Sequence, residues 1–361
     1  MMRYQALDVL RGLTVAVMML VNMPGAWQAV YTPLLHAHWH GWTLTDLVFP
    51  FFLFVIGSAM YFSLKKSESL ANNNNVSRIF KRAFYLFSIG LMLNTLWMIP
   101  PNGVENLRIM GVMQRISLAY LIGGLLILCC RRSHLYIVSL LILVGYSSSL
   151  AWYSESPYSL QDNLVRFVDM SILGEAHMYQ LRGIAFEPEG LLSTLPAVVN
   201  ILFGFEITRV LNQATRPLVA VKKLTLICAI TFFAAIILQN WIPINKYLWT
   251  SSYVLFTSAW ATGVLLFLIW ILDIKGRSKF AFPFIVFGLN PLFIYVFHWV
   301  LTVLYYKIPV ADSNLYETMY QWILAGDTAN KAASLLFAML QLLLLWMTCY
   351  GLYRRNIIIK L

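Results

Sequence analysis

Long apolar runs recur along the whole chain and are separated by short polar stretches. A helix that crosses a lipid bilayer needs about 20 consecutive, mostly apolar residues. Ten candidate spans meet this description, and they lie near residues 6–26, 45–64, 79–99, 110–130, 134–152, 190–210, 223–241, 250–272, 281–305 and 332–352. The pattern predicts an all-α, polytopic membrane protein with about ten transmembrane helices, which we take as a single domain over residues 1–361.

Composition supports this class. Of the 361 residues, 60% are hydrophobic and 11% are charged, and the mean hydropathy is +0.71. Soluble domains are roughly 45–50% apolar and about 25% charged, so a water-soluble fold is excluded. The formal net charge is +11, but the basic residues lie in short loops between apolar runs. They do not form a stripe that follows a phosphate backbone, so nucleic acid is not an expected partner.

The basic residues also predict an orientation. Nineteen of the 26 Lys and Arg residues gather in the termini and in alternate loops, which places both termini in the cytoplasm by the positive-inside rule. Six others fall on the outer side, and they are Arg108, Arg166, Arg182, Lys246, Lys307 and Lys331. The longest polar stretch, near 153–189, falls outside as well, and a long connection that is neither low-complexity nor Gly/Ser-rich is often functional.

Three of the six histidines, His36, His38 and His40, lie in the outer loop between the first two spans. Asn22 precedes His36 by fourteen residues and Asp46 follows it by ten, so both can approach the loop from the ends of the flanking spans. Histidine transfers protons near neutrality, Asn can donate to a developing oxyanion, and Asp can orient an imidazole. Together, these three residue types indicate a site for proton transfer.

Two other interpretations of this loop stay open. With Trp39 and Trp42, the histidines can form a belt of amphipathic rings at the membrane interface. Alternation along a strand would instead place all three imidazoles on one face, where they can bind a metal ion. No cysteine or carboxylate at tight spacing supports the metal, so we expect none.

Several polar groups lie at predicted membrane depth. Arg115 is expected to face a polar cavity or an anion, unless its side chain snorkels to the interface. Arg11 is expected to pair with Asp8, three residues away on the same helical face. His298 and Asn290 lie in one span, where they line a ligand pathway or serve packing.

The acidic residues at the outer side also allow two interpretations. Glu187 and Glu189 are ordinary acids at a helix start, or groups that meet a substrate amine. Glu206 and Arg209 have the spacing of a structural ion pair.

Several blocks resemble the heparan-α-glucosaminide N-acetyltransferase family and its bacterial relatives. They are RYQALDVLRG at 3–12, HAHWHGWTLTDLVFP at 36–50, LRIMGVMQR at 107–115, PEG at 188–190, KYLWTSSY at 246–253 and GLNPLFIYVFH at 288–298. The second block, with His36, Trp39, Gly41, Thr43 and Asp46, is the most specific, and the blocks together cover most of the chain.

The resemblance implies acetyl transfer across a bacterial inner membrane, with cytosolic acetyl-CoA as donor and an amino sugar or cell-envelope glycan as outer acceptor. His36 matches the family's catalytic histidine, Asn22 its partner asparagine, and Asp46 the acid of the same motif. The acetyl-CoA contacts are expected from Arg115, Arg11, His298 and Asn290. His40 departs from the eukaryotic pattern, which carries Asn there, and the large N-terminal lumenal domain is missing, so a heparan fragment is not the expected acceptor.

The lipid bilayer and a second copy of the chain complete the expected partners. Two rival functions remain on sequence grounds. One is a transporter that exports an anionic or sugar-linked substrate without acyl chemistry, which Arg115 suits equally well. The other is a metal-dependent membrane hydrolase built on the three histidines. If the chain is an acetyltransferase, His36 can act as general base or can carry the acetyl group itself.

Overall fold

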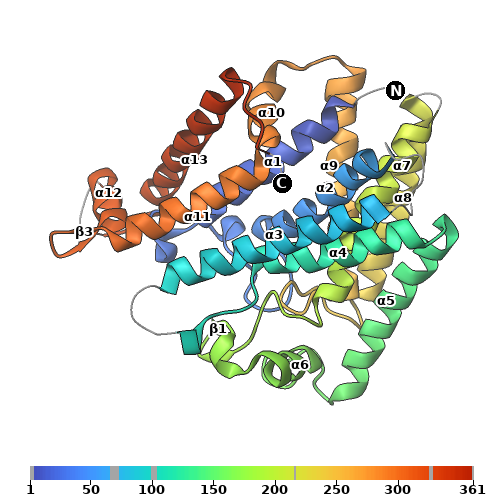
Figure 1. Ribbon diagram of the computed structural model, residues 1–361, viewed down its shortest axis with the longest axis horizontal. Coiled ribbons are helices and arrows are strands. Elements are labelled where there is room, and N and C mark those ends of the chain that lie inside the picture. The colour runs from blue at the N-terminus through green and yellow to red at the C-terminus, as the bar shows by residue number, and fades with distance from the viewer. Residues whose placement is uncertain (1–3, 66–72, 99–103, 215–216, 325–327, 360–361) are drawn as a thin grey trace. The chain divides into compact units, whose positions relative to one another are not determined.

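The computed structural model describes residues 4–65, 73–98, 104–214, 217–324 and 328–359 (Figure 1). Over these residues the regular structure is helical apart from two short hairpins, which confirms the all-α prediction. Four basic residues counted on the predicted cytoplasmic side, Arg3, Lys66, Arg216 and Lys360, lie outside the described residues.

The α-helices are α1 (Gln5–Asn22), α2 (Leu44–Lys65), α3 (Asn73–Met98), α4 (Val112–Cys129), α5 (Arg132–Tyr153), α6 (Leu164–Leu173), α7 (Thr194–Gln213), α8 (Pro217–Leu238), α9 (Ser251–Leu268), α10 (Phe282–Leu289), α11 (Pro291–Lys307), α12 (Leu315–Ile323) and α13 (Lys331–Arg354). Strands β1 (Gln180–Leu181) and β2 (Ile184–Ala185) form one antiparallel hairpin, and β3 (Pro309–Val310) and β4 (Ser313–Asn314) form the other. Short 3₁₀ turns η1 (Trp27–Ala29), η2 (Thr32–Leu34), η3 (Val104–Asn106), η4 (Glu175–His177) and η6 (Lys279–Ala281) and a π-helical turn η5 (Ile269–Ile274) complete the described elements.

Eight helices in the described part of the chain are long and apolar enough to cross a membrane, namely α1, α2, α4, α5, α7, α8, α9 and α13. A ninth candidate is the span predicted at 281–305, which is not straight. It bends by 72° between Lys279–Leu289 and Pro291–Lys307, because Pro291 cannot continue the helix before it. The tenth prediction, at 79–99, coincides with α3, which falls short of the same criterion because Arg78, Lys81 and Arg82 lie in its first half.

The chain divides into two compact units. The first takes the described residues of His38–Trp42 and Leu53–Leu266, and the second takes those of Arg3–Ala37, Thr43–Phe52 and Phe267–Leu361. One boundary therefore falls within α2, and the loop before α2 contributes to both units. The action of the whole chain as one domain and the cytoplasmic location of both termini stay predictions.

In the second unit, α1 packs against α10, α11 and α13 (Figure 1). Two glycines make the α1–α10 contact close. A Cβ at Gly12 would lie 1.6 Å from the carbonyl oxygen of Phe284, and a Cβ at Gly288 would lie 2.8 Å from that of Asp8. Small residues let helix backbones approach closely in a membrane, which explains a glycine in each of these motif blocks.

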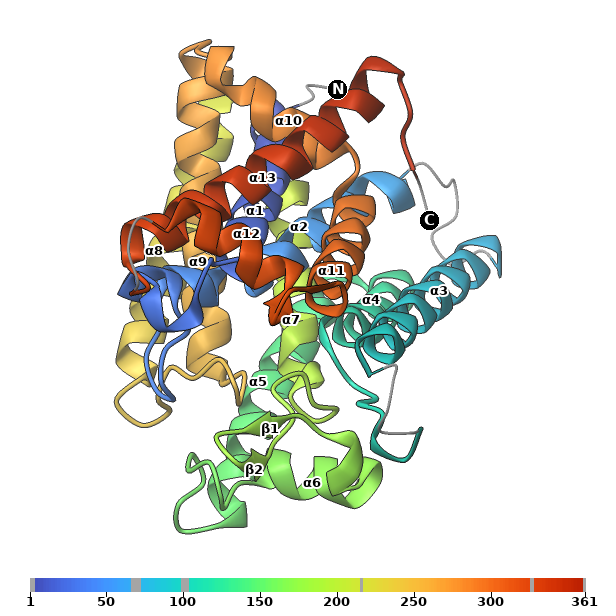
Figure 2. The same cartoon turned by 90° about the vertical axis from the view of Figure 1, so that its left-hand side faces the viewer.

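In the first unit, α4 packs against α3 and α7, and α7 also contacts α5 and α8. Gly57 of α2 and Gly204 of α7 again allow backbones to touch, since a Cβ at either would lie within 2.0 Å of a carbonyl oxygen of the other helix. The polar stretch between α5 and α7 is ordered (Figure 2) and folds as α6 with the β1–β2 hairpin. It covers a core of Tyr146, Leu150, Val165, Phe186 and Leu248.

Candidate active site

His36 and Asp46 form a direct side-chain pair in the second unit. Nδ1 of His36 lies 2.7 Å from Oδ1 of Asp46, whose side chain is 1% exposed, whereas the His36 side chain is 42% exposed. An ionised carboxylate only accepts hydrogen bonds, so Nδ1 carries the proton in this pair. In that tautomer the imidazole lone pair lies on Nε2, which is the arrangement required of a base oriented by an acid.

Asp46 is itself fixed by the start of α2. Its Oδ2 accepts the backbone N–H groups of Ala37 and Thr43, each at 2.9 Å. The spacing Thr43-x-x-Asp46 is that of a capping box, in which the third helical residue reaches back to the N-cap backbone N–H. Because these two donors belong to the backbone, they hold Oδ2 in place and leave Oδ1 turned toward His36.

Asn22 is the last residue of α1 and is exposed. It belongs to the same unit as His36 and Asp46, at the other end of the segment that joins α1 to α2. The structure thus brings two of the three predicted catalytic residues into contact and places the third at the exposed helix end nearest to them in sequence.

Three of the four residues predicted to contact acetyl-CoA also lie in the second unit. Arg11 forms the expected ion pair with Asp8. The Asn290 amide donates to the carbonyl of Ile357 at 3.1 Å and accepts the N–H of Ile359 at 2.8 Å, so it fastens the C-terminal segment.

His298 differs from these residues. It is 4% exposed, and among the described residues its ring nitrogens have only a loose contact with the Tyr295 backbone and no hydrogen bond of normal geometry. Buried polar groups are normally hydrogen-bonded. Of the three candidates in the second unit, His298 is therefore the one whose side chain best fits contact with a bound polar molecule.

Arg115 lies in the first unit and is fully buried, so it does not snorkel to an interface. Its guanidinium carbon lies 4.7 Å from the centroid of the Trp249 ring, a cation–π distance. Nη2 contacts Oγ of Ser193 and lies 3.4 Å from the carbonyl oxygen of Gly190. Nε and Nη1 have no hydrogen-bond partner within the part of the chain that the structure describes.

A buried charge cluster next to Arg115 was not predicted. Arg108 donates from Nε and Nη2 to Glu187, at 2.9 and 2.5 Å, and from Nη2 to Glu189 at 2.7 Å. Burial lowers the pKa of Arg108, but its pairing with both carboxylates outweighs this and raises the pKa above its usual value. For Glu187, burial outweighs the arginine and the pKa rises, whereas the surrounding cations lower the pKa of Glu189. These acids pair with arginine rather than forming an ordinary helix cap.

Asp169 belongs to the same unit and is also fully buried. Its Oδ1 accepts the N–H of Leu191 at 2.8 Å, and the Leu192 backbone also contacts this carboxyl group. Burial raises the pKa of Asp169 to about 7, against the lowering effect of its backbone hydrogen bonds and of Arg115. The sequence showed only an acidic stretch at 153–189 and gave no sign of which acids are buried.

Of the three loop histidines, His36 belongs to the second unit and His38 and His40 to the first. Residues 36–42 are irregular rather than a strand, so alternation does not place the rings on one face. His40 Nδ1 lies 3.3 Å from the Asn245 amide in the first unit, and burial lowers the pKa of His40. Within the described residues, no group of three His, Cys, Asp or Glu residues has the arrangement of a metal site.

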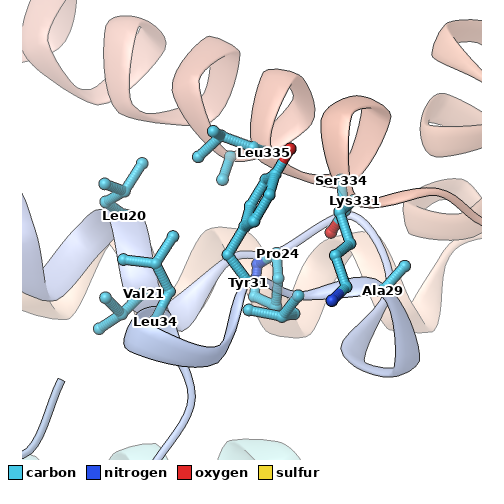
Figure 3. A pocket seen from close by; sticks show the side chains of 11 residues that line it. Leu20, Val21, Pro24, Ala29, Tyr31, Leu34, Lys331, Ser334 and Leu335 are labelled. Carbon is cyan, nitrogen blue, oxygen red and sulfur yellow. The ribbon is translucent and has the colours of Figure 1, made fainter. Parts of the chain in front are cut away.

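A crevice in the second unit lies between the end of α1, the turns that follow it and the start of α13 (Figure 3). It is mostly apolar, and Lys331 Nζ lies 5.9 Å from the Tyr31 ring at its edge. Neither Asn22 nor His36 lines it.

Comparison with known proteins gives a consistent match. The family model described as "Heparan-alpha-glucosaminide N-acetyltransferase, catalytic" matches residues 3–216. The heparan-alpha-glucosaminide N-acetyltransferase of Homo sapiens is 26% identical over 416 residues, which cover 99% of this chain and 60% of that protein. The Mus musculus protein of the same name is 26% identical over 387 residues, 91% of this chain and 56% of the relative. The chain thus spans less than two thirds of the length of these relatives.

Proposed function

Because the chain belongs to the heparan-alpha-glucosaminide N-acetyltransferase family, we propose that it is a multi-pass enzyme of the bacterial inner membrane that moves an acetyl group from cytosolic acetyl-CoA to an amine on an outer amino sugar or cell-envelope glycan. The observation that carries this proposal is the pairing of the exposed His36 with the buried Asp46. Such a pair supplies an oriented base at the surface where an acceptor arrives.

In the direct route, His36 acts as general base. The acceptor amine attacks the carbonyl carbon of the thioester, and His36 Nε2 takes a proton from the amine. A C–N bond forms, the C–S bond breaks, and the proton passes from His36 to the departing thiolate. Asp46 stabilises the imidazolium that exists between these steps. Asn22 donates to the oxyanion of the tetrahedral intermediate, a contribution of about 3 kcal/mol for one such donor.

In the relay route, His36 is the nucleophile. Nε2 attacks the thioester carbonyl, the C–S bond breaks, and CoA leaves as the thiolate. The amine then attacks the acetyl-imidazole, the C–N bond to His36 breaks, and the amine proton passes to water or thiolate. Both routes need Nδ1 to be held by Asp46, so the geometry suits either.

The donor contacts are part of the same proposal. His298 fits a polar group of acetyl-CoA because its buried ring nitrogens make no hydrogen bond of normal geometry within the described residues. Arg11 supplies a cation of the kind that a CoA phosphate prefers. Arg115 belongs to the first unit, so its contact with acetyl-CoA is a separate prediction. Asn290 contributes by fastening the C-terminal segment beside α10 and α11.

The decisive variant is His36→Ala, with His38→Ala as the matched control from the same loop. We expect His36→Ala to bind acetyl-CoA like the wild type and to lose acetyl transfer by a factor on the order of 10² to 10⁴, as for removal of a general base. His38→Ala should retain transfer. Undiminished turnover in folded His36→Ala protein would refute the proposal.

Two further measurements separate the alternatives. Incubation with radiolabelled acetyl-CoA and no acceptor should leave stoichiometric label on the protein in the relay route and none in the direct route. Release of free CoA that depends on an added amino sugar distinguishes acetyl transfer from transport, because a transporter without acyl chemistry releases none.

A further inference from the structure

The Thr43 hydroxyl lies between two groups of the His36 site. Its Oγ1 is 2.5 Å from the carbonyl oxygen of Leu35 and 3.1 Å from Oδ2 of Asp46. All of these residues belong to the second unit. A threonine at a helix start usually turns its hydroxyl onto a backbone N–H of the first turn. Here the hydroxyl instead reaches backward to the segment that carries the histidine.

This contact fixes the backbone on one side of His36. The Leu35 carbonyl and the His36 nitrogen share one planar peptide group, so a hydrogen bond to that oxygen orients the whole plane. The following peptide plane is held as well, because the Ala37 N–H donates to Asp46 Oδ2 at 2.9 Å. Both peptide planes that flank His36 are therefore tied to the start of α2.

The hydroxyl has a single proton, and the shorter contact shows that it donates to Leu35. Asp46 Oδ2 accepts the two shorter hydrogen bonds, at 2.9 Å, from the backbone N–H groups of Ala37 and Thr43. With both peptide planes fixed and Nδ1 bonded to Oδ1, the imidazole has little freedom to rotate away from the direction set by Asp46. An exposed histidine needs such restraint more than a buried one, since no surrounding core holds its ring.

We infer that Thr43 is a positioning residue for the His36–Asp46 pair, which it holds by clamping the Leu35–His36 peptide to the first turn of α2. The inference rests on the proposed acetyl transfer. Thr43 does not touch the reacting atoms in this role. Its loss misplaces the base without removing it, and misplacement near 1 Å can lower a rate by about 10²-fold.

The test compares Thr43→Val with Thr43→Ser and with a neighbouring control. Valine keeps the shape and the backbone N–H that caps α2, but it removes the hydroxyl. Thr45→Val is the control, because Thr45 also lies at the start of α2 and its hydroxyl has only a 3.5 Å contact, to Pro33. We expect Thr43→Val to lower kcat about 10- to 100-fold with the KM for acetyl-CoA nearly unchanged. Thr43→Ser should restore most of the rate, and Thr45→Val should resemble the wild type.

A double-mutant cycle with His36→Ala separates positioning from general damage. If Thr43 acts through His36, Thr43→Val should cost nothing further once His36 is alanine. An equal loss in both backgrounds, or wild-type kcat in Thr43→Val, would overturn the inference. So would a loss of folded protein, by size-exclusion chromatography, in both Thr43→Val and Thr43→Ala but not in Thr43→Ser, because the hydroxyl would then serve the fold. Absence of acetyl transfer by the wild type would instead count against the proposed function.

Discussion

Asp46→Asn is the sharpest test of the His36–Asp46 geometry, because the structure dictates how the amide must sit. Oδ2 of Asp46 accepts two backbone N–H groups, from Ala37 and Thr43. Only the amide oxygen can take that place, so the amide NH₂ must fall where Oδ1 now faces His36 Nδ1. The NH₂ is a donor, and it forces the histidine proton from Nδ1 to Nε2. The base is then blocked at the atom that should accept a proton.

The expected loss in kcat follows from this change of tautomer. The corresponding Asp-to-Asn change in a serine protease triad leaves the geometry intact and lowers kcat about 10⁴-fold. We expect a reduction of 10³- to 10⁴-fold on that scale, equivalent to about 4–5 kcal/mol in the barrier. Folding should be little affected, because both backbone donors keep an acceptor.

The assay is transfer of radiolabelled acetyl from acetyl-CoA to an amino sugar by purified protein in detergent. Glu317→Gln is a matched control, since Glu317 is also an acid in the first turn of a helix of the second unit, and it accepts from Ser313 rather than from a histidine. Folded Asp46→Asn protein with kcat within tenfold of the wild type would refute the reasoning, as would an equal loss in Glu317→Gln.

Two predictions concern the buried charges of the first unit. Arg108→Leu should destabilise the protein by about 3–5 kcal/mol, because it leaves Glu187 buried without its cation. The double variant Arg108→Leu with Glu187→Leu should recover part of the loss in apparent melting temperature. No recovery in the double variant would contradict this. Burial raises the pKa of Asp169 from its usual 3.8 to about 7 in the folded state, so the folded state holds the proton more tightly than the unfolded chain does. The contribution of Asp169 to the free energy of unfolding is therefore fully present below about pH 4. This contribution falls by at most about 4 kcal/mol as the pH rises through 7. Asp169→Asn should reduce the fall in melting temperature between pH 5 and 8, whereas the same change at the exposed Asp162 should not. If the melting temperature of Asp169→Asn falls with pH as steeply as that of the wild type, the raised pKa of Asp169 is refuted.

The spans were predictable because each depends on one long apolar run, a property of local sequence alone. The break at Asn290 could have been predicted only by recognising Pro291 as the start of a new helix within an otherwise continuous apolar run. The contact of His36 with Asp46 was predictable from the ten-residue spacing, since a short loop keeps both near the start of α2. The pairing of Arg108 with Glu187 was not, because 79 residues separate them and neither stands out from other outer charges.

Of the groups described above, we compare His36, His40, His298 and Asp169 as a base that works near neutrality. Their surroundings favour His36. Asp169 has a suitable pKa but is fully buried, so no acceptor amine can reach its oxygens. His298 is buried within a helix of the bent pair, so an acceptor amine that arrives at the surface cannot reach its ring. His40 is hydrogen-bonded to the Asn245 amide, and burial lowers the pKa of His40. His36 alone among these four combines an exposed ring with a buried carboxylate that fixes its tautomer, which is why the acceptor amine is expected to lose its proton there.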